Sequence, residues 1–146
     1  MDDLSTVLLV EDNPDDAELI RHAFMKAGVA NPLIVVDDGD KAIDYLHGRS
    51  IYADRAAFPL PGLFLLDLKL PRRSGFEVLE SIRANRPTRN IPVIVLTSSN
   101  QANDIERAYE LGANSYLVKP IGRDALITMV RSLDAFWLKL NQASAS

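Results

Sequence analysis

The chain has 146 residues, of which 47% are hydrophobic, so it is long enough for one domain with a substantial core. It contains no cysteine, which excludes a disulfide framework and a thiolate metal site. A net charge of −4 argues against a nucleic-acid-binding protein, and no apolar run approaches the ~18 residues of a membrane span. The acidic amino terminus lacks the features of a signal peptide. We therefore expect one cytoplasmic domain over residues 1–140 and a disordered tail over 141–146.

Short apolar runs alternate along the chain with longer segments of helical period. The apolar runs predict strands at about 6–10, 33–36, 63–66, 93–96 and 115–118. The helical segments are about 14–28, a short helix ending near Gly48, and then about 76–85, 102–111 and 123–140. Strands that alternate with helices predict a doubly wound parallel sheet covered on both faces, in the order 2-1-3-4-5.

The first helix carries clear boundary signals. Asn13 can cap it with its side chain, Pro14 suits the first helical position, and Gly28 follows the last turn. One face of this helix is apolar and is expected to pack on the sheet: Ala17, Ile20, Ala23, Phe24 and Ala27. In contrast, residues 49–62 form a long connection that contains prolines and aromatic residues.

The run from Leu63 to Leu66 has the continuous apolar character of a central parallel strand. Asp67 follows this strand directly, and Pro71 prevents it from continuing as an inner strand. Open α/β sheets bind their ligands at the carboxyl ends of their strands. An isolated Asp at such a position is more often a loop or helix cap, so the residues at the other strand ends decide its role.

In the predicted order the first and third strands are neighbours, and their carboxyl ends open a crevice. Glu11 and Asp12 end the first strand, so their carboxylates are expected to meet that of Asp67. Acids before a helix also interact with its dipole, but three converging carboxylates repel one another without a counter-ion. Oxygen ligands completed by water suit Mg²⁺, which favours a magnesium site.

The last two strands end in residues of complementary chemistry. Thr97, Ser98 and Ser99 offer hydroxyl donors, and Lys119 offers an ammonium group. A lysine aimed at carboxylates is by default a structural ion pair. Together with the acids, however, these groups suit a phosphoryl group: metal and lysine would neutralise its oxygens, a hydroxyl would bond to one, and a carboxylate would attack.

From about Thr6 to Trp137 the chain resembles a response-regulator receiver domain, the phosphoacceptor module of two-component signalling. The resemblance rests on segments that occur in the family's order and spacing: Leu9-Val10-Glu11-Asp12-Asn13, Leu66-Asp67-Leu68-Lys69-Leu70-Pro71 with Gly75, Val95-Leu96-Thr97, Gly112-Ala113 and Lys119-Pro120. It implies a flavodoxin-like (βα)5 fold and a single receiver domain that takes a phosphoryl group from the phosphohistidine of a histidine kinase.

The resemblance also implies roles for the acidic residues. Asp67 would be the phosphoacceptor, and Glu11, Asp12 and Asp67 would bind Mg²⁺ together with the backbone carbonyl of Lys69. Lys69 departs from the uncharged residue that is common at its position. Its ammonium is expected either to alter the lifetime of the phosphoryl group or to be simply solvated.

By the same resemblance, Thr97 and Lys119 would contact the phosphoryl group, and the Lys119–Pro120 peptide bond would be cis. Tyr116, three residues before the lysine, falls at the family's aromatic switch position. Phosphorylation would draw Thr97 inward and allow Tyr116 to rotate.

Two further features resemble the stand-alone regulators that partner phytochrome-type histidine kinases: the connection 49–62 and the ending Leu133-Asp134-Ala135-Phe136-Trp137-Leu138. Too few residues follow Leu140 for a DNA-binding or catalytic module. The expected output is therefore a change of protein contacts, without enzymatic activity and without a nucleic-acid or membrane partner.

Three alternative functions share part of this pattern. A haloacid dehalogenase-type phosphatase also uses an Asp nucleophile after a strand, but it requires a second Asp where Lys69 stands. A flavodoxin-like cofactor binder requires a phosphate-binding loop rich in Gly, Ser and Thr after the first strand, which is absent. A receiver-like module that signals without phosphorylation is disfavoured by the complete set of acids, hydroxyl and lysine.

The last predicted helix has an apolar arc of about 200°, wider than the ~100° stripe that one core requires. The middle of this arc is expected to pack on the sheet. The apolar residues on its two flanks then need another surface to cover them. The preceding helices or the connection 49–62 would do so within one chain. We favour instead a homodimer through the last helix, with these interface residues: Met129, Leu133, Phe136 and Leu140.

Overall fold

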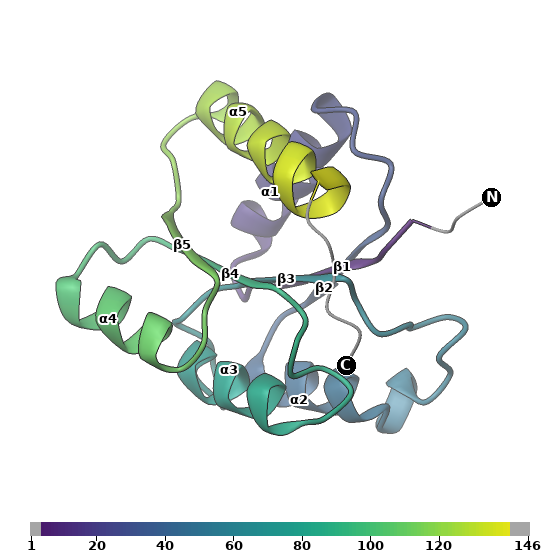
Figure 1. Ribbon diagram of the computed structural model, residues 1–146. Coiled ribbons are helices and arrows are strands. Elements are labelled where there is room, and N and C mark those ends of the chain that lie inside the picture. Colours follow the sequence, from purple (N-terminus) through teal and green to yellow (C-terminus); the bar gives the residue numbers. More distant parts are fainter. Residues whose placement is uncertain (1–3, 141–146) are drawn as a thin grey trace.

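The computed structural model describes residues 4–140 as a three-layer α/β fold (Figure 1). Its middle layer is a five-stranded parallel sheet in the order β2-β1-β3-β4-β5. The strands are β1 (Val7–Val10), β2 (Leu33–Val36), β3 (Leu63–Leu66), β4 (Val93–Thr97) and β5 (Ser115–Val118). The predicted doubly wound, flavodoxin-like fold and its strand order are confirmed. The predicted tail, 141–146, lies outside the described residues.

Helices cover both faces of the sheet (Figure 1). One face carries α1 (Pro14–Lys26) and α5 (Arg123–Leu133), and the other carries α2 (Gly39–His47), α3 (Gly75–Ala84) and α4 (Ala102–Glu110). A short 3-10 helix, η1 (Ser50–Tyr52), lies in the long connection before β3. A π-helical segment, η2 (Asp134–Leu140), continues α5.

The core has two halves because strand side chains alternate between the faces of the sheet. Leu8 and Val10 of β1 pack with α2 and α3, whereas Val7 and Leu9 pack with α1 and α5. Every residue of β1, β3 and β4 is buried. Each buried Leu or Val stabilises the fold by about 1.5–3 kcal/mol relative to exposure, so these strands form a rigid base for the residues at their ends.

The parallel register brings the strand ends to one edge of the sheet. Val10 is paired with both Val36 and Leu66, and Thr97 is paired with Val118. The residues that follow β1, β3 and β5 therefore lie at the same edge as the end of β4.

The signals at the start of α1 are confirmed. The Asn13 side chain accepts hydrogen bonds from the backbone N–H groups of Asp15, at 2.9 Å, and Asp16, at 3.1 Å. Gly28 follows the helix with a φ of +75°, a conformation that glycine adopts without strain. The predicted apolar face packs against the sheet as expected, with Ile20, Ala23 and Phe24 buried and Ala17 and Ala27 partly buried.

The long connection 49–62 is an ordered segment packed on α2. Tyr45 of α2 is fully buried, and its ring lies 5.0 Å from that of Tyr52 and 6.1 Å from that of Phe58. The Tyr45 hydroxyl donates to the Pro59 carbonyl at 2.8 Å. Arg55 donates to the Leu46 carbonyl at 2.9 Å, which satisfies an acceptor in the last turn of α2. This connection therefore covers α2, not the flanks of α5.

Two predictions about the carboxyl-terminal part are wrong. The last helix is not a single α-helix over 123–140, because it changes to π-helical geometry at Asp134. In that geometry Asp134 and Lys139, five residues apart, form an ion pair of 2.8 Å. Among residues 4–140 there is also no cis peptide bond, so Lys119–Pro120 is trans. The trans form is favoured by about 0.5–1 kcal/mol for such bonds, and the turn into α5 uses Gly122, with a φ of +98°.

The predicted dimer interface needs one correction. Leu133 is only 5% exposed and packs in the core with Leu126 and Val130, so it has almost no surface to offer a partner. Phe136 is 51% exposed, and Met129 is partly buried. The side chain of Leu140 lies outside the described part of the structure.

Candidate phosphoryl and metal site

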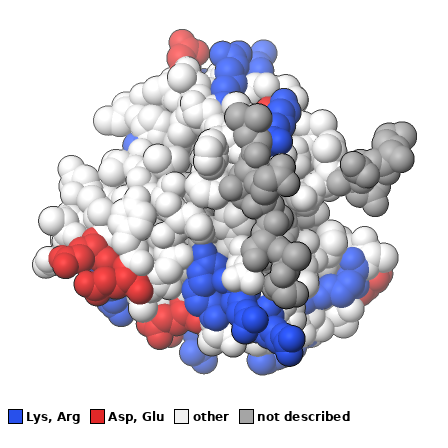
Figure 2. All heavy atoms as spheres, viewed as in Figure 1, with Lys and Arg blue, Asp and Glu red and all other residues white. Residues whose placement is uncertain are grey.

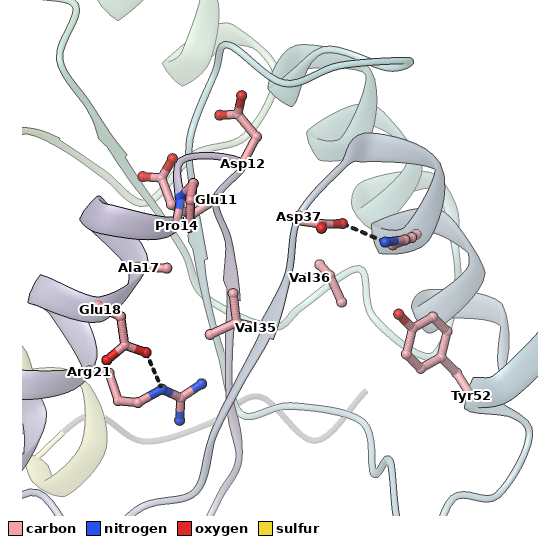
Figure 3. Close-up of a pocket in the computed structure, with 11 residues that line it drawn as sticks. Glu11, Asp12, Pro14, Ala17, Glu18, Arg21, Val35, Val36, Asp37 and Tyr52 are labelled. Carbon is pink, nitrogen blue, oxygen red and sulfur yellow. Dashed lines mark hydrogen bonds and ion pairs between the residues drawn. The ribbon is translucent and has the colours of Figure 1, made fainter.

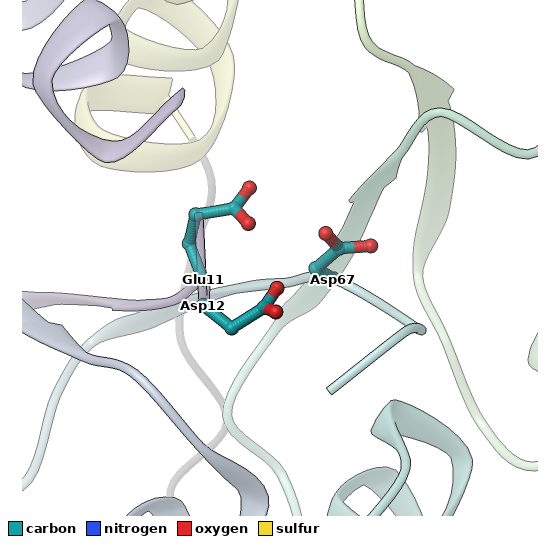
Figure 4. Close-up of side chains that lie close together, drawn as sticks. All are labelled: Glu11, Asp12 and Asp67. Atoms are coloured by element: carbon teal, nitrogen blue, oxygen red, sulfur yellow. The ribbon is translucent and has the colours of Figure 1, made fainter. Parts of the chain in front are cut away.

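The carboxylates of Glu11, Asp12 and Asp67 lie together beyond the ends of β1 and β3 (Figure 4). One oxygen of each lies within 4.8 Å of the others. Glu11 and Asp67 are buried, and Asp12 is exposed. The adjacent strands β1 and β3 thus bring Glu11 and Asp12 next to Asp67, which lies far from them in the sequence.

Lys119, directly after β5, lies among three carboxylates. Its Nζ donates hydrogen bonds to Asp67 Oδ2 at 3.0 Å and to Asp16 Oδ2 at 2.9 Å. Glu11 Oε1 lies 2.5 Å from the same nitrogen, as an ion pair without the angles of a hydrogen bond. The predicted proximity of Lys119 to the acids is therefore present, and Asp16 is an addition that the sequence did not indicate.

Burial and charge shift the protonation of both buried partners. Desolvation raises the pKa of Glu11 to about 7, although the ion pair with Lys119 and the hydrogen bond from the Asn13 N–H oppose this shift. Burial by itself would lower the pKa of Lys119, but the close contacts with the carboxylates of Glu11, Asp16 and Asp67 raise it above its usual value. Lys119 is therefore a permanent cation, and one cation does not balance the surrounding acids at neutral pH.

The loop after β3 holds the Asp67 carboxylate in place. Asp67 Oδ1 accepts hydrogen bonds from the N–H of Leu68 at 2.7 Å and of Lys69 at 3.4 Å, and the Lys69 side chain is exposed. A Cβ at Gly75 would lie 2.1 Å from the Asp67 carbonyl oxygen, so only glycine allows α3 to start this close to the loop. The free oxygen, Oδ2, faces Lys119.

Thr97 and Tyr116 lie on β4 and β5. Thr97 is fully buried at the end of β4, and its hydroxyl has no hydrogen-bond partner among the described residues. Its carbonyl accepts from the Lys119 N–H at 2.8 Å, so the threonine and the lysine are held at the same edge. Tyr116 is partly buried, and its hydroxyl donates to the Ser99 carbonyl at 2.9 Å.

Sequence reasoning missed two contacts at this edge. Asp16 lies in the first turn of α1, where an acid favourably meets the helix dipole, and no sequence pattern indicates its contact with Lys119. Ser99 donates to the Asp104 carboxylate at 2.6 Å and accepts from the Gln101 N–H at 3.3 Å, which orders the start of α4. Ser98, considered as a hydroxyl donor, is exposed.

A hollow of about 410 Å³ opens beside the acids, between α1 and α2 and over β2 (Figure 3). Glu11 and Asp12 lie at one end of it, and Val35 and Val36 of the edge strand line it. Its other charged side chains are paired with each other, Arg21 with Glu18 at 3.8 Å and Lys41 with Asp37 at 2.7 Å. The hollow therefore leaves the acidic cluster open on this side without adding a free cation to it.

A family comparison identifies this arrangement. Residues 7–131 match the model of the response regulator receiver domain. The chain belongs to the response regulator receiver family. Receiver domains of this kind generally act as signalling proteins, and the carboxylate cluster with Asp67 fits their phosphorylation site.

A response regulator from Synechocystis is similar to this chain in sequence and in structure. Response regulator Rcp1 of Synechocystis sp. (strain ATCC 27184 / PCC 6803 / Kazusa) is 38% identical over 91% of this chain and 88% of its own length. The structure of its Mn²⁺-bound form has a TM-score of 0.85 at 36% identity, over 97% of this chain and 99% of that one. In the part of the chain that the structure describes, no helix is long and apolar enough to cross a bilayer.

Two other solved receiver structures cover nearly the whole chain. RPA3017, from red light signalling of R. palustris, has a TM-score of 0.91 at 36% identity, over 98% of this chain and 100% of that chain. The phosphorylated cyanobacterial phytochrome response regulator RcpA has a TM-score of 0.89 at 34% identity, over 97% of this chain and 99% of that chain.

Proposed function

We propose that this receiver accepts a phosphoryl group from a kinase phosphohistidine on Oδ2 of Asp67. The observation that carries the proposal is the contact between this oxygen and the Lys119 ammonium, 3.0 Å apart, beside the unpaired hydroxyl of Thr97. The carboxylate oxygen forms the new O–P bond as the P–N bond breaks, and the imidazole leaves with that electron pair. Lys119 and Thr97 then bind two phosphoryl oxygens.

The donor set suits a divalent metal, which we propose is Mg²⁺. Carboxylate oxygens of Glu11, Asp12 and Asp67 would bind it, with the Lys69 carbonyl as a further ligand. The raised pKa of Glu11 reflects a site where a cation would relieve the cost of buried charge. When bound, the metal supplies neutralisation of phosphoryl charge.

We infer that the kinase partner is of the phytochrome type. The support is likeness: RcpA is described as a phytochrome response regulator, and RPA3017 belongs to red light signalling. The connection 49–62, which resembles that of the regulators of phytochrome-type kinases, is ordered and packs on Tyr45.

We propose that phosphorylation changes the surface through Thr97 and Tyr116. A phosphoryl group adds roughly −1.5 to −2 charges, which would attract the Thr97 hydroxyl and pull on the loop that follows. That loop carries Ser99, whose carbonyl binds the Tyr116 hydroxyl. A shift of this loop would therefore bias the orientation of Tyr116 between two states.

We further propose a homodimer through α5 and η2. A groove of about 390 Å³ runs along β5 and these helices, and it is lined by Leu117, Met129, Phe136 and Trp137 among others. Figure 2 shows a largely uncharged surface between the acidic side chains over α4 and the basic ones at the top of the view. Phe136, half-exposed and packed edge-on against Trp137 at 4.9 Å, is the anchor that a second copy would bury.

Intact mass spectrometry after incubation with acetyl phosphate and Mg²⁺ tests the central proposal. The wild-type chain should gain one phosphoryl group, and Asp67→Asn should gain none while it keeps its fold, because Asp67 fills no part of the apolar core. Omission of Mg²⁺ should strongly slow the phosphorylation of the wild-type chain. An equal phosphorylated fraction in wild type and Asp67→Asn would refute the assignment.

A further inference from the structure

The site contains a fourth carboxylate that the proposed phosphotransfer does not use. Asp16 lies in the first turn of α1, and its Oδ2 is 2.9 Å from Lys119 Nζ, although the two residues are 103 positions apart. The Lys119 side chain is 16% exposed and the Asp16 side chain is 37% exposed, so the pair is partly shielded from water. The contact joins the start of α1 to the end of β5.

Asp16 stands apart from the proposed metal ligands. Only Glu11, Asp12 and Asp67 form the close carboxylate group among the described residues. Two of the three carboxylates around the ammonium, those of Glu11 and Asp67, belong to that group. Glu11 and Asp67 are also proposed to bind the metal or to take part in phosphotransfer, whereas Asp16 does neither.

Both partners are mounted on rigid backbone. The N–H of Asp16 is bonded to the Asn13 cap at 3.1 Å, and the N–H of Lys119 is bonded to the Thr97 carbonyl at 2.8 Å. The lysine side chain, in contrast, has several rotatable bonds and loses conformational entropy when it is ordered. Its ammonium has three protons. A bond from one proton to Asp16 leaves the others for the phosphoryl site.

We propose that Asp16 is a positioning residue that holds the Lys119 ammonium at the phosphoryl site. The inference rests on the proposed role of Asp67 as phosphoacceptor. Asp16 does not contact the transferred group and acts only through Lys119. When Asp67 becomes an acyl phosphate, the ammonium keeps a partner that neither binds the metal nor carries the phosphoryl group, and it stays ordered for the phosphoryl oxygens.

Two effects of Asp16 on phosphotransfer have opposite signs. Ordering of Lys119 speeds the reaction, whereas a negative charge near the site repels an anionic phosphodonor. Asp16→Asn removes the charge and weakens the anchor with almost no change of volume. A slower reaction therefore supports positioning, and an unchanged or faster reaction overturns it.

The experiment measures the phosphorylation rate with acetyl phosphate at saturating Mg²⁺ by intact mass. Asp15→Asn is the matched control: Asp15 lies in the same turn, its N–H binds the same Asn13 oxygen, and it has no ion pair among the described residues. Asp16→Asn should lower the rate about tenfold, and Asp15→Asn should change it roughly twofold or less. A decrease of the same size in both variants overturns the proposal.

A double-mutant cycle separates positioning from a general structural effect. In a chain that carries Lys119→Met, the further change Asp16→Asn should leave the residual rate unchanged or raise it, because only the repulsion of the anionic donor by Asp16 is then removed. Melting temperatures of the four chains report any loss of fold. A rate decrease by Asp16→Asn that persists without Lys119 overturns the proposal.

A crystal structure with Mg²⁺ and beryllofluoride, a phosphoryl analogue, gives a readout without turnover. Lys119 Nζ should lie within hydrogen-bond distance of both Asp16 and a fluoride, and a nitrogen turned away from Asp16 overturns the proposal. Failure of the proposed role of Asp67 and failure of the proposed role of Asp16 give different results. A wild-type chain that takes no phosphoryl group refutes the role of Asp67 and this inference with it. Phosphorylation that is equally fast in wild type and Asp16→Asn refutes the inference alone.

Discussion

The guanidinium of Arg83 donates two hydrogen bonds to the carbonyl oxygen of Gly112, from Nε at 3.0 Å and from Nη2 at 2.8 Å. It also donates to the Ile91 carbonyl at 2.7 Å and to the Asn114 side chain at 2.8 Å. Partial burial of the guanidinium lowers the pKa of Arg83 through desolvation. This side chain thus joins α3 to the segments before β4 and β5.

Arg83→Met is expected to lower the free energy of unfolding by about 2 kcal/mol, because it leaves partly buried carbonyls without a donor. Urea denaturation measures the loss. Arg86→Met is the control: Arg86 is exposed in the loop after α3, and its change should cost roughly 0.5 kcal/mol or less. Equal stability of the two variants would contradict the role given to Arg83.

The buried phenol of Tyr45 should make the fold sensitive to alkali. Burial raises its pKa from 10.0 to about 12. The stability that depends on the neutral phenol is therefore complete below pH 10 and is lost as the pH rises toward 12. A pKa difference of this size between the folded and the unfolded chain corresponds to about 2–3 kcal/mol of unfolding free energy.

Tyr45→Phe should lose about 1 kcal/mol at neutral pH, because its hydrogen bond to Pro59 is gone. It should then fall less than the wild type between pH 10 and 12, as measured by urea denaturation at each pH. Tyr109→Phe, which changes a half-exposed tyrosine, should keep the alkaline loss of the wild type. An identical alkaline loss in Tyr45→Phe would show that another group causes it.

Tyr116 should sample two orientations before phosphorylation, with the population shifted by a phosphoryl analogue. Structures with and without beryllofluoride should differ in the Tyr116 rotamer and in the loop that carries Ser99. NMR line shapes of the Tyr116 ring follow the exchange in solution. One unchanged rotamer and one unchanged loop in both states would rule this switch out.

Phe136→Asp should weaken self-association roughly tenfold or more, since about 1.4 kcal/mol of lost apolar contact has that effect. Sedimentation at micromolar concentration measures it. Ile51→Asp is the control: Ile51 is 69% exposed on η1, which packs with α2 on the opposite face of the sheet from α5. A monomeric wild type, with and without the phosphoryl analogue, contradicts the proposed dimer, as does a Phe136→Asp variant that associates like the wild type.

Most of the fold and the core of the site could be predicted from the sequence because their signals are local. Apolar runs such as Leu63–Leu66 mark buried strands, and Asn13 and Gly28 mark the ends of a helix. Parallel strands end at one edge, so the acids after β1 and β3 had to meet once the strand order was assigned. The resemblance to a known family added the expected choice of Thr97 among the three hydroxyl residues and of Asp67 as the phosphoacceptor.

The remaining features depend on the packing of distant segments, which no local pattern encodes. The contact of Asp16 with Lys119 needs the start of α1 to face the end of β5, and the Arg83 network needs α3 to lie against the turn at Gly112. The change to π-helical geometry at Asp134 also has no signal in the sequence, because the sequence period there is that of an ordinary helix. The sequence thus determined which groups lie at the strand ends, and the tertiary structure decided which of them form hydrogen bonds and ion pairs with one another.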